Sequence, residues 1–190
     1  CRARFSSLAC LLACSAAVLM LPTSRMTHVR VGIGLYGIWP SEEVRMASAA
    51  PLRPVLAWKA RVALVKSVPA GTGIGYGLTA TVGRPSRIAL IPVGYADGYP
   101  RHLSSKGEVL IQGVRCPVLG RICMNMFMAD ATDVPGDVCE GDVATLIGRD
   151  GAEEITADEL ARQAETIAYE IVARLNPVIP RVVSLAQDAA

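Results

Sequence analysis

The sequence has few of the residues that bind metals or nucleic acids. It contains only two histidines, His28 and His102, and no Cys-x-x-Cys pair, so we do not expect a zinc site. Aromatic residues make up 5% of the chain, and 19 basic against 17 acidic side chains leave a formal charge of +2. No run of lysine or arginine is interleaved with aromatic residues, so nucleic acid is not an expected partner.

The cysteines do not form a recognisable framework. Their spacing is irregular and the chain is not short, which favours reduced thiols in a cytosolic protein over a set of disulfides. The six are Cys1, Cys10, Cys14, Cys116, Cys123 and Cys139.

The chain also lacks a long hydrophobic run. Residues 8–21 are apolar and follow Arg2 and Arg4, as in a secretory signal, but a membrane-spanning helix needs about 20 residues. We therefore expect no membrane partner. The chain opens on Cys1 rather than on methionine, from which we expect a fragment whose true start lies upstream.

Short apolar runs dominate the sequence beyond its first quarter. Hydrophobic residues make up 52% of the chain, enough for a packed core. Runs separated by Gly, Pro and Asp predict a compact, mainly β domain at 45–190. A proline-containing stretch at 39–54 is expected to be a linker, with a domain boundary near residue 45. Strands are expected at about 55–67, 87–94, 108–112, 115–119, 121–130 and 142–148.

One helix is well signalled near the C-terminus. Thr156, with Glu159 three residues later, forms a capping box that starts a helix over roughly 155–175. Tyr169 lies about 200° from Ile167 around this helix and so points away from the apolar stripe. A tyrosine on the domain surface, or a helix broken near Thr166, fits the pattern equally well. The stripe comprises Leu160, Ala164, Ile167, Ile171 and Leu175.

A glycine-rich segment overlaps the end of an expected buried strand at 27–35, which carries Gly32 and Gly34. The run from Gly32 to Gly37 matches the dinucleotide pattern Gly-x-Gly-x-x-Gly, but Pro40 interrupts the expected helix and 51–60 contains no acidic residue. Dinucleotide binding is therefore not expected, although glycine amides leave another phosphate-bearing cofactor open. Arg30 shares a strand face with Gly32, but a surface arginine is the simpler interpretation. Ser15 adds a hydroxyl near this region or packs in an apolar segment.

A phenol at an expected strand end is the main candidate for chemistry. Tyr95 sits in the run Gly94-Tyr95-Ala96-Asp97-Gly98-Tyr99-Pro100-Arg101, where catalytic side chains are often found. A tyrosine with a pKa near 10 needs a cationic neighbour or a relay to act as a base. From pattern alone, an ordinary structural aromatic is the simpler interpretation. Cys123 and the methionines at 124, 126 and 128 are expected to pack in the core.

Several of these segments, taken in order and spacing, resemble bacterial alanine racemases. The resemblance covers about residues 14–182. Its segments are Val29-Arg30-Val31-Gly32-Ile33-Gly34-Leu35-Tyr36-Gly37, the run around Tyr95, Gly120-Arg121-Ile122-Cys123-Met124, Thr166-Ile167-Ala168-Tyr169-Glu170, Trp58-Lys59-Ala60-Arg61-Val62, the 68–77 region and Glu154-Ile155-Thr156-Ala157.

The resemblance implies a pyridoxal phosphate enzyme with an N-terminal (β/α)8 barrel and a strand-rich, β-barrel-like C-terminal domain with one or two helices. Residues 1–44 would then be the last part of the barrel plus a linker, and 45–190 the second domain.

The same resemblance assigns roles to individual residues. It implies that Tyr95 is the catalytic tyrosine and that Met124 contacts the substrate carboxylate, both in the partner subunit's site of a homodimer. Arg30 would bond the pyridine nitrogen. The expected phosphate contacts are Gly32, Ile33, Ser15 and Tyr169.

The sequence departs from the family pattern at several points. The family's lysine motif that carries the cofactor is absent, and Lys59, Lys66 and Lys106 lie in different contexts. The barrel arginine that holds the substrate carboxylate is absent too. Cys14 stands where asparagine is usual, Leu11 where histidine is common, and Asn125 where aspartate is common. An amide at Asn125 can keep one hydrogen bond while giving up charge.

The expected function is interconversion of L- and D-alanine by two bases, which supplies D-alanine for peptidoglycan in the cytoplasm. This chain alone is expected to be inactive. A racemase for serine or with broad specificity is the alternative of the same class. A non-catalytic remnant or a partner-binding β domain is the alternative of another class, and the upstream sequence would distinguish them.

Overall fold

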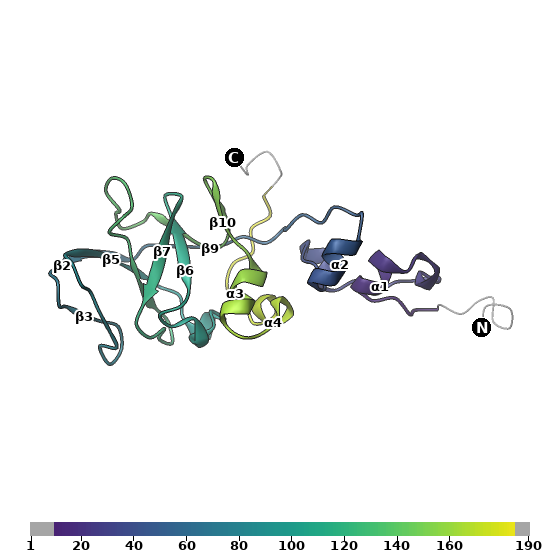
Figure 1. Cartoon of the computed structure of the whole chain (residues 1–190), viewed down its shortest axis with the longest axis horizontal. Helices are drawn as coiled ribbons and strands as arrows, with labels where there is room; N and C mark the ends of the chain where they lie inside the picture. Colours follow the sequence, from purple (N-terminus) through teal and green to yellow (C-terminus); the bar gives the residue numbers. More distant parts are fainter. Residues whose placement is uncertain (1–9, 185–190) are drawn as a thin grey trace. The chain divides into compact units, whose positions relative to one another are not determined.

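The computed structural model describes residues 10–184 and divides the chain into two compact units between Leu56 and Ala57. Figure 1 draws both units. The division falls after the boundary predicted near residue 45. That the first unit is the end of a barrel stays a prediction.

The first unit holds short helices and one parallel contact. Leu11 and His28 form a parallel bridge, and the backbone amide of Arg30 donates to the Ala13 carbonyl at 2.9 Å. Parallel pairing across a helical connection is the arrangement of a β/α unit. Its helices are α1 (Ser15–Met20), η1 (Pro22–Ser24), η2 (Ile33–Tyr36) and α2 (Glu42–Ala47).

Two expectations for this unit were wrong. The strand expected at 27–35 is a single bridge followed by the 3-10 helix η2, because the amides of Gly32 and Gly34 donate to the Ser15 hydroxyl instead of to a neighbouring strand. The argument that Arg30 and Gly32 share a strand face fails with it. The linker expected at 39–54 contains α2, whose N-terminus is capped by the Ser41 hydroxyl.

The second unit is a strand-rich domain, as predicted. Its large sheet has the order β1-β9-β6-β7-β8-β5-β2, with β10 paired to β9, and β3 and β4 form a separate hairpin. The order has two ends, so the described strands form an open sheet rather than a closed barrel. The strands are β1 (Trp58–Arg61), β2 (Leu64–Val68), β3 (Gly73–Ile74), β4 (Ala80–Thr81), β5 (Ser86–Ile91), β6 (Glu108–Ile111), β7 (Val114–Leu119), β8 (Phe127–Asp130), β9 (Val143–Asp150) and β10 (Glu153–Ile155).

An aromatic group lies in the core of this domain. Tyr99 is fully buried, stacks on Phe127 with ring centroids 4.9 Å apart, and meets the edge of Trp58 at 5.9 Å. Tyr99 follows directly on the turn that carries Tyr95, so the core fixes one end of that turn.

The single helix expected at 155–175 is two helices, α3 (Ala157–Gln163) and α4 (Ala168–Ala173). Glu165 between them adopts a left-handed conformation with φ of +59°, so the alternative of a break near Thr166 is confirmed. The expected cap is present, because the Thr156 hydroxyl accepts from the Glu159 amide. Ile167 precedes α4 and is 62% exposed, so its place in the apolar stripe was wrong.

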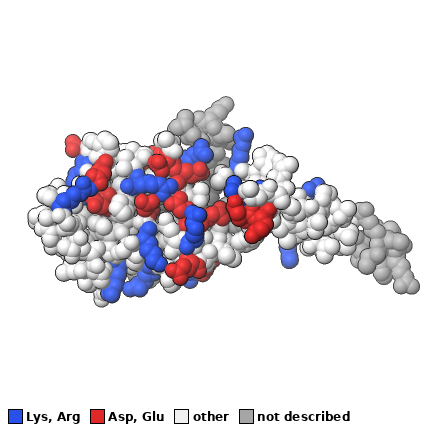
Figure 2. Space-filling view, in the orientation of Figure 1, with Lys and Arg blue, Asp and Glu red and all other residues white. Residues whose placement is uncertain are grey.

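Charged side chains are interspersed over the face of the protein that Figure 2 shows, with basic and acidic groups next to one another. Ion pairs in the second unit include Arg115 with Glu159 and Lys106 with Glu165. Among the residues that the structure describes, no helix is long and apolar enough to cross a membrane.

Candidate active site

The first unit brings together three of the predicted cofactor residues. The buried hydroxyl of Ser15 accepts hydrogen bonds from the amides of Gly32 at 3.0 Å and Gly34 at 3.3 Å. Ser15 is the first residue of α1, and Gly32 precedes η2, whose first residue is the buried Ile33. Two helix N-termini therefore meet at one hydroxyl.

This arrangement fits a phosphate group. The start of α1 has no side-chain cap from the residue before it, so it keeps backbone donors available, whereas at η2 the Gly32 and Gly34 amides are bonded to Ser15. A Cβ at Gly34 would lie 3.1 Å from the Val31 side chain and 3.4 Å from the Ser15 hydroxyl, so the tighter contact would be with Val31. The donor set is made of amides and one hydroxyl, which is the chemistry that holds phosphate.

The positive charge of Arg30 acts on the residue next to Ser15. The pKa of the exposed Cys14 thiol lies below its ordinary value, chiefly through the backbone amide of Ala17 and to a smaller extent through the positive charge of Arg30. Cys14 adjoins Ser15, so Arg30 contributes positive potential beside the cradle.

In the second unit, one turn brings Tyr95 and Met124 together. The amides of Tyr95 and Ala96 donate to the carbonyls of Cys123 and Met124, at 3.1 and 3.0 Å. Gly94 makes this possible, because an added Cβ would lie 2.2 Å from the Met124 carbonyl oxygen. The turn is closed by the Asp97 carboxylate, which accepts from the Gly94 amide at 2.8 Å.

Both side chains project outward from this fixed backbone. Tyr95 is 44% exposed and Met124 is 55% exposed. The expected core role of the methionine group was wrong for Met124 and Met126, and the strand expected at 121–130 shortens to β8 because residues 121–126 serve the Tyr95 turn instead. Cys123 is half-buried and its thiol donates to the Arg121 carbonyl.

A second exposed phenol was missed by the sequence analysis. Tyr76 is 71% exposed and stands between Gly75 and Gly77, both of which have positive φ. A Cβ at Gly77 would lie 3.2 Å from an Arg121 guanidinium nitrogen. The flanking glycines were the available signal, since they mark a turn that exposes the side chain between them.

The Tyr76 turn is strained as well as exposed. Leu78 has a φ of +49°, which is unusual for a side chain of its size, and the turn packs against Gly120, where a Cβ would meet the Ile74 carbonyl at 2.8 Å. Strain of this kind is often retained at functional sites. The turns of Tyr76 and Tyr95 thus both pack on the segment 120–124.

Tyr169 lies in α4 and is 41% exposed, which agrees with an orientation away from the helix stripe. It belongs to the second unit, whereas Ser15, Gly32, Ile33 and Arg30 belong to the first.

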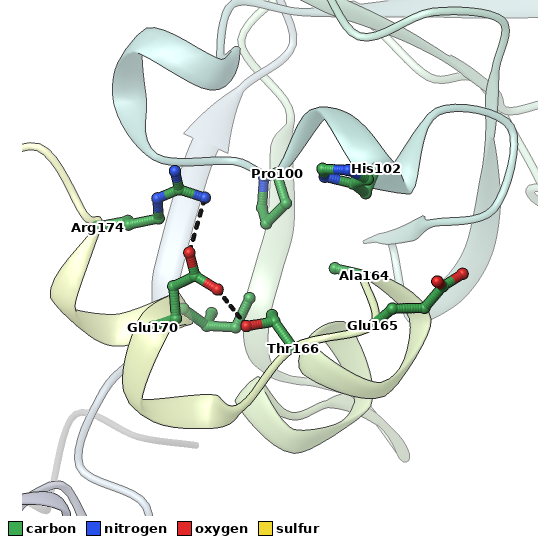
Figure 3. Close-up of a pocket in the computed structure, with 8 residues that line it drawn as sticks. Pro100, His102, Ala164, Glu165, Thr166, Glu170 and Arg174 are labelled. Carbon is green, nitrogen blue, oxygen red and sulfur yellow. Dashed lines mark hydrogen bonds and ion pairs between the residues drawn. The ribbon is translucent and has the colours of Figure 1, made fainter.

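A cavity of about 240 Å³ lies beside α4 and contains none of the predicted site residues. Figure 3 shows Glu170 within it, paired with Arg174 at 3.0 Å and accepting from the Thr166 hydroxyl. Glu170 and Arg174 are thus engaged with one another, while Glu165, which also lines the cavity, pairs with Lys106. In the described part of the chain, no group of three or more His, Cys, Asp or Glu side chains is placed to hold a metal ion.

Comparison with known proteins identifies the family to which the chain belongs. The family described as alanine racemase, C-terminal domain, matches residues 55–183. The alanine racemase of Leptospira interrogans is 43% identical over 175 residues, which cover 89% of this chain and 45% of that protein. That of Halothermothrix orenii is 47% identical over 167 residues, covering 88% and 43%. The chain thus spans less than half the length of the curated relatives it matches.

Solved structures show the same relationship. The Bacillus anthracis alanine racemase with bound L-Ala-P aligns with a TM-score of 0.81 at 40% identity, over 86% of this chain and 42% of that one. The enzyme from Streptomyces coelicolor aligns with a TM-score of 0.80 at 42% identity, over 95% and 47%. This chain belongs to the alanine racemase family, of which it carries the C-terminal domain.

Proposed function

We propose that the complete protein to which this chain belongs is an alanine racemase that uses pyridoxal phosphate. The observation that carries the proposal is the clamped turn that holds Tyr95 and Met124 in fixed, exposed positions, in a domain of this family. On this proposal the enzyme is a cytoplasmic homodimer, and its D-alanine supplies peptidoglycan synthesis.

The first unit would hold the phosphate of the cofactor. The amides of Gly32 and Ile33 and the Ser15 hydroxyl form the cradle, and Tyr169 of the second unit is a further proposed phosphate contact. Arg30 would face the pyridine nitrogen, and since a guanidinium stays charged it would keep that nitrogen unprotonated. Pyridoxal phosphate supplies the electron sink for removal of the α-proton.

The second unit would supply a phenol as one of the two bases. Tyr95 is the residue that the sequence resemblance assigns to this role. The structure gives a specific reason to test Tyr76 beside it, because a phenolate needs a cationic neighbour and the Arg121 guanidinium lies against the Tyr76 turn. The ionisable group that closes the Tyr95 turn is the Asp97 carboxylate, whose charge opposes a phenolate.

Donation to a partner explains the exposure of these side chains. A base that works within its own domain would be expected to lie in a cavity, whereas Tyr76, Tyr95 and Met124 all project from the domain surface. We propose that they complete the site of the second subunit. Loss of a general base typically costs about 10²- to 10⁴-fold in rate.

Two matched substitutions in the complete enzyme test the proposal. Tyr95→Phe and Tyr76→Phe each remove one hydroxyl, and turnover is measured separately from L-alanine and from D-alanine. The variant that lacks the base is expected to lose at least about a hundredfold, with unequal loss in the two directions. Full turnover in both variants and both directions would overturn the donated-phenol proposal. Turnover of serine by the wild-type enzyme at the rate of alanine would favour a broad-specificity racemase.

The chain by itself is expected to be inactive. Its three lysines, Lys59, Lys66 and Lys106, all lie in the second unit, and Lys106 is paired with Glu165. Mixing the chain with pyridoxal phosphate should give neither a visible band of bound cofactor nor racemisation of alanine. Either result would contradict the proposal that the cofactor lysine lies outside this chain.

A further inference from the structure

The turn that carries Tyr95 is clamped on a second side by the chain that leaves α4. The side-chain amide of Asn176 donates to the Ala96 carbonyl at 3.0 Å, and the Asn176 backbone amide donates to the Asp97 carbonyl at 3.1 Å. Residues 80 positions apart are thereby joined at one short turn.

The contact is close as well as hydrogen-bonded. Gly98, which ends the turn, has a φ of +102°, and a Cβ there would lie 2.3 Å from the Arg174 carbonyl oxygen. Only glycine allows the backbone of 174–176 to approach this near. Arg174 is in turn paired with Glu170 of α4, as Figure 3 shows.

These contacts connect the predicted site residues of the second unit. Tyr169 lies at the start of α4, and Asn176 follows its end. On the other side of the turn, the Ala96 amide donates to the Met124 carbonyl. A continuous path of backbone and side-chain contacts therefore runs from the helix of Tyr169, through Asn176 and the Tyr95 turn, to Met124.

We infer that Asn176 is a positioning residue that fixes the Tyr95–Met124 turn to helix α4. The inference rests on the proposed function, in which Tyr169 contacts the phosphate in its own subunit's site while Tyr95 and Met124 serve the partner's site. Asn176 then ties the cofactor contact of one site to the groups donated to the other. It does so whether Tyr95 or Tyr76 is the base, because Met124 is held by the same turn.

Two substitutions separate this role from a local structural one. The Asn176 side-chain oxygen also accepts from the Val178 amide at 3.0 Å. Asn176→Asp keeps that acceptor and removes the donor to Ala96, whereas Asn176→Ala removes both. Arg181→Ala is the matched control, because Arg181 contacts the carbonyls of Leu175 and Asn176 but not the Tyr95 turn.

The first measurement is amide hydrogen exchange on this chain. Exchange at Tyr95 and Ala96, whose amides bond to Cys123 and Met124 rather than to Asn176, is expected to accelerate about threefold to tenfold in both Asn176 variants. Amides of β6 and β9 should be unchanged, as should all of these sites in Arg181→Ala. Unchanged exchange at Tyr95 and Ala96 in both Asn176 variants would overturn the inference.

The second measurement is made on the complete enzyme. Asn176→Asp is expected to lower kcat by about threefold to tenfold while the affinity for pyridoxal phosphate stays within twofold, since the cradle in the first unit is untouched. A fall in cofactor affinity alone would contradict a positioning role for the donated groups. If the complete enzyme shows no racemase activity, the proposed function fails, and the exchange measurement still decides whether Asn176 holds the turn.

Discussion

Gly94 and Met124 approach so closely that an added Cβ atom on the glycine would lie 2.2 Å from the methionine carbonyl oxygen. Gly94→Ala must therefore push the 123–124 backbone away and break the two hydrogen bonds that position Tyr95. We expect a loss of about 2 to 3 kcal/mol in the free energy of unfolding, as for other overpacked sites, measured by urea denaturation of this chain.

Gly83→Ala is the control for that experiment. A Cβ at Gly83 would have no heavy atom within 4 Å, and its φ lies outside the positive region. It should leave stability within about 0.5 kcal/mol of the unsubstituted chain. Equal losses in the two variants would show that the close approach of Gly94 to Met124 does not hold in solution.

Arg115 joins three elements of the β domain through one guanidinium. It pairs with Glu108 at 2.8 Å and with Glu153 and Glu159 at 2.7 Å each, and it also donates to the Glu154 carbonyl. These contacts, with Glu159 foremost, raise the pKa of the Arg115 guanidinium above its ordinary value, so its charge persists across all accessible pH. Arg115→Met would leave the three carboxylates facing one another without a counter-charge.

We expect Arg115→Met to lower the free energy of unfolding by about 2 kcal/mol, below the value for a fully buried pair because Arg115 is 31% exposed. Arg84→Met is the matched control, since Arg84 and Asp133 form a single exposed pair whose loss should change the free energy of unfolding less. Both are measured by urea denaturation at the same salt concentration. A smaller loss of stability in Arg115→Met than in Arg84→Met would contradict a stabilising role for the three ion pairs of Arg115.

The strand-rich domain could be predicted from the sequence because its signals are local. Turn residues separate short apolar runs, and the Thr156 cap marks the start of a helix by its own side chain. The break before α4 was visible only as an alternative, because it depends on Glu165 accepting a left-handed conformation that no residue pattern requires.

The arrangement around Tyr95 was beyond sequence reasoning for a different reason. Its turn is held by carbonyls at 123–124 and by Asn176, and these contacts are set by the tertiary fold. Likewise, the 27–35 segment has the composition of a strand. Its Gly32 and Gly34 amides nevertheless donate to the Ser15 hydroxyl, which lies 17 and 19 residues earlier in the chain. Tyr76 carried a local signal in its flanking glycines, but nothing in the sequence placed the Arg121 guanidinium beside that turn.

The buried thiol of Cys116 should make the free energy of unfolding of the β domain fall as the pH becomes alkaline. The residue is 1% exposed, and burial raises the pKa of its thiol from 9.0 to about 12. Between these values the unfolded chain loses the proton while the folded chain keeps it, so the free energy of unfolding falls as pH rises. The slope from this one group approaches about 1.4 kcal/mol per pH unit.

Urea denaturation at pH 9 and at pH 10.5 measures this slope. Cys116→Ala should show a shallower decline than the unsubstituted chain, because other groups that titrate in the window are common to both. Cys139→Ala, which removes an exposed thiol, should leave the slope unchanged. Identical slopes in the chain and in Cys116→Ala would contradict the burial of this thiol.

Ser15 holds the proposed phosphate cradle together, so its substitution should weaken cofactor binding in a way that depends on the phosphate. In the complete enzyme, Ser15→Ala removes the acceptor for the Gly32 and Gly34 amides as well as a hydroxyl donor to the ligand. One hydrogen bond to a charged group corresponds to about a tenfold to hundredfold change in affinity, measured by cofactor titration.

Unphosphorylated pyridoxal makes no such contact, so its affinity should change less than threefold. Ser24→Ala, which removes a hydroxyl bonded to the Leu21 carbonyl in the same unit, should alter neither affinity. Equal losses for pyridoxal and pyridoxal phosphate in Ser15→Ala would mean that Ser15 supports the fold of this unit rather than the phosphate.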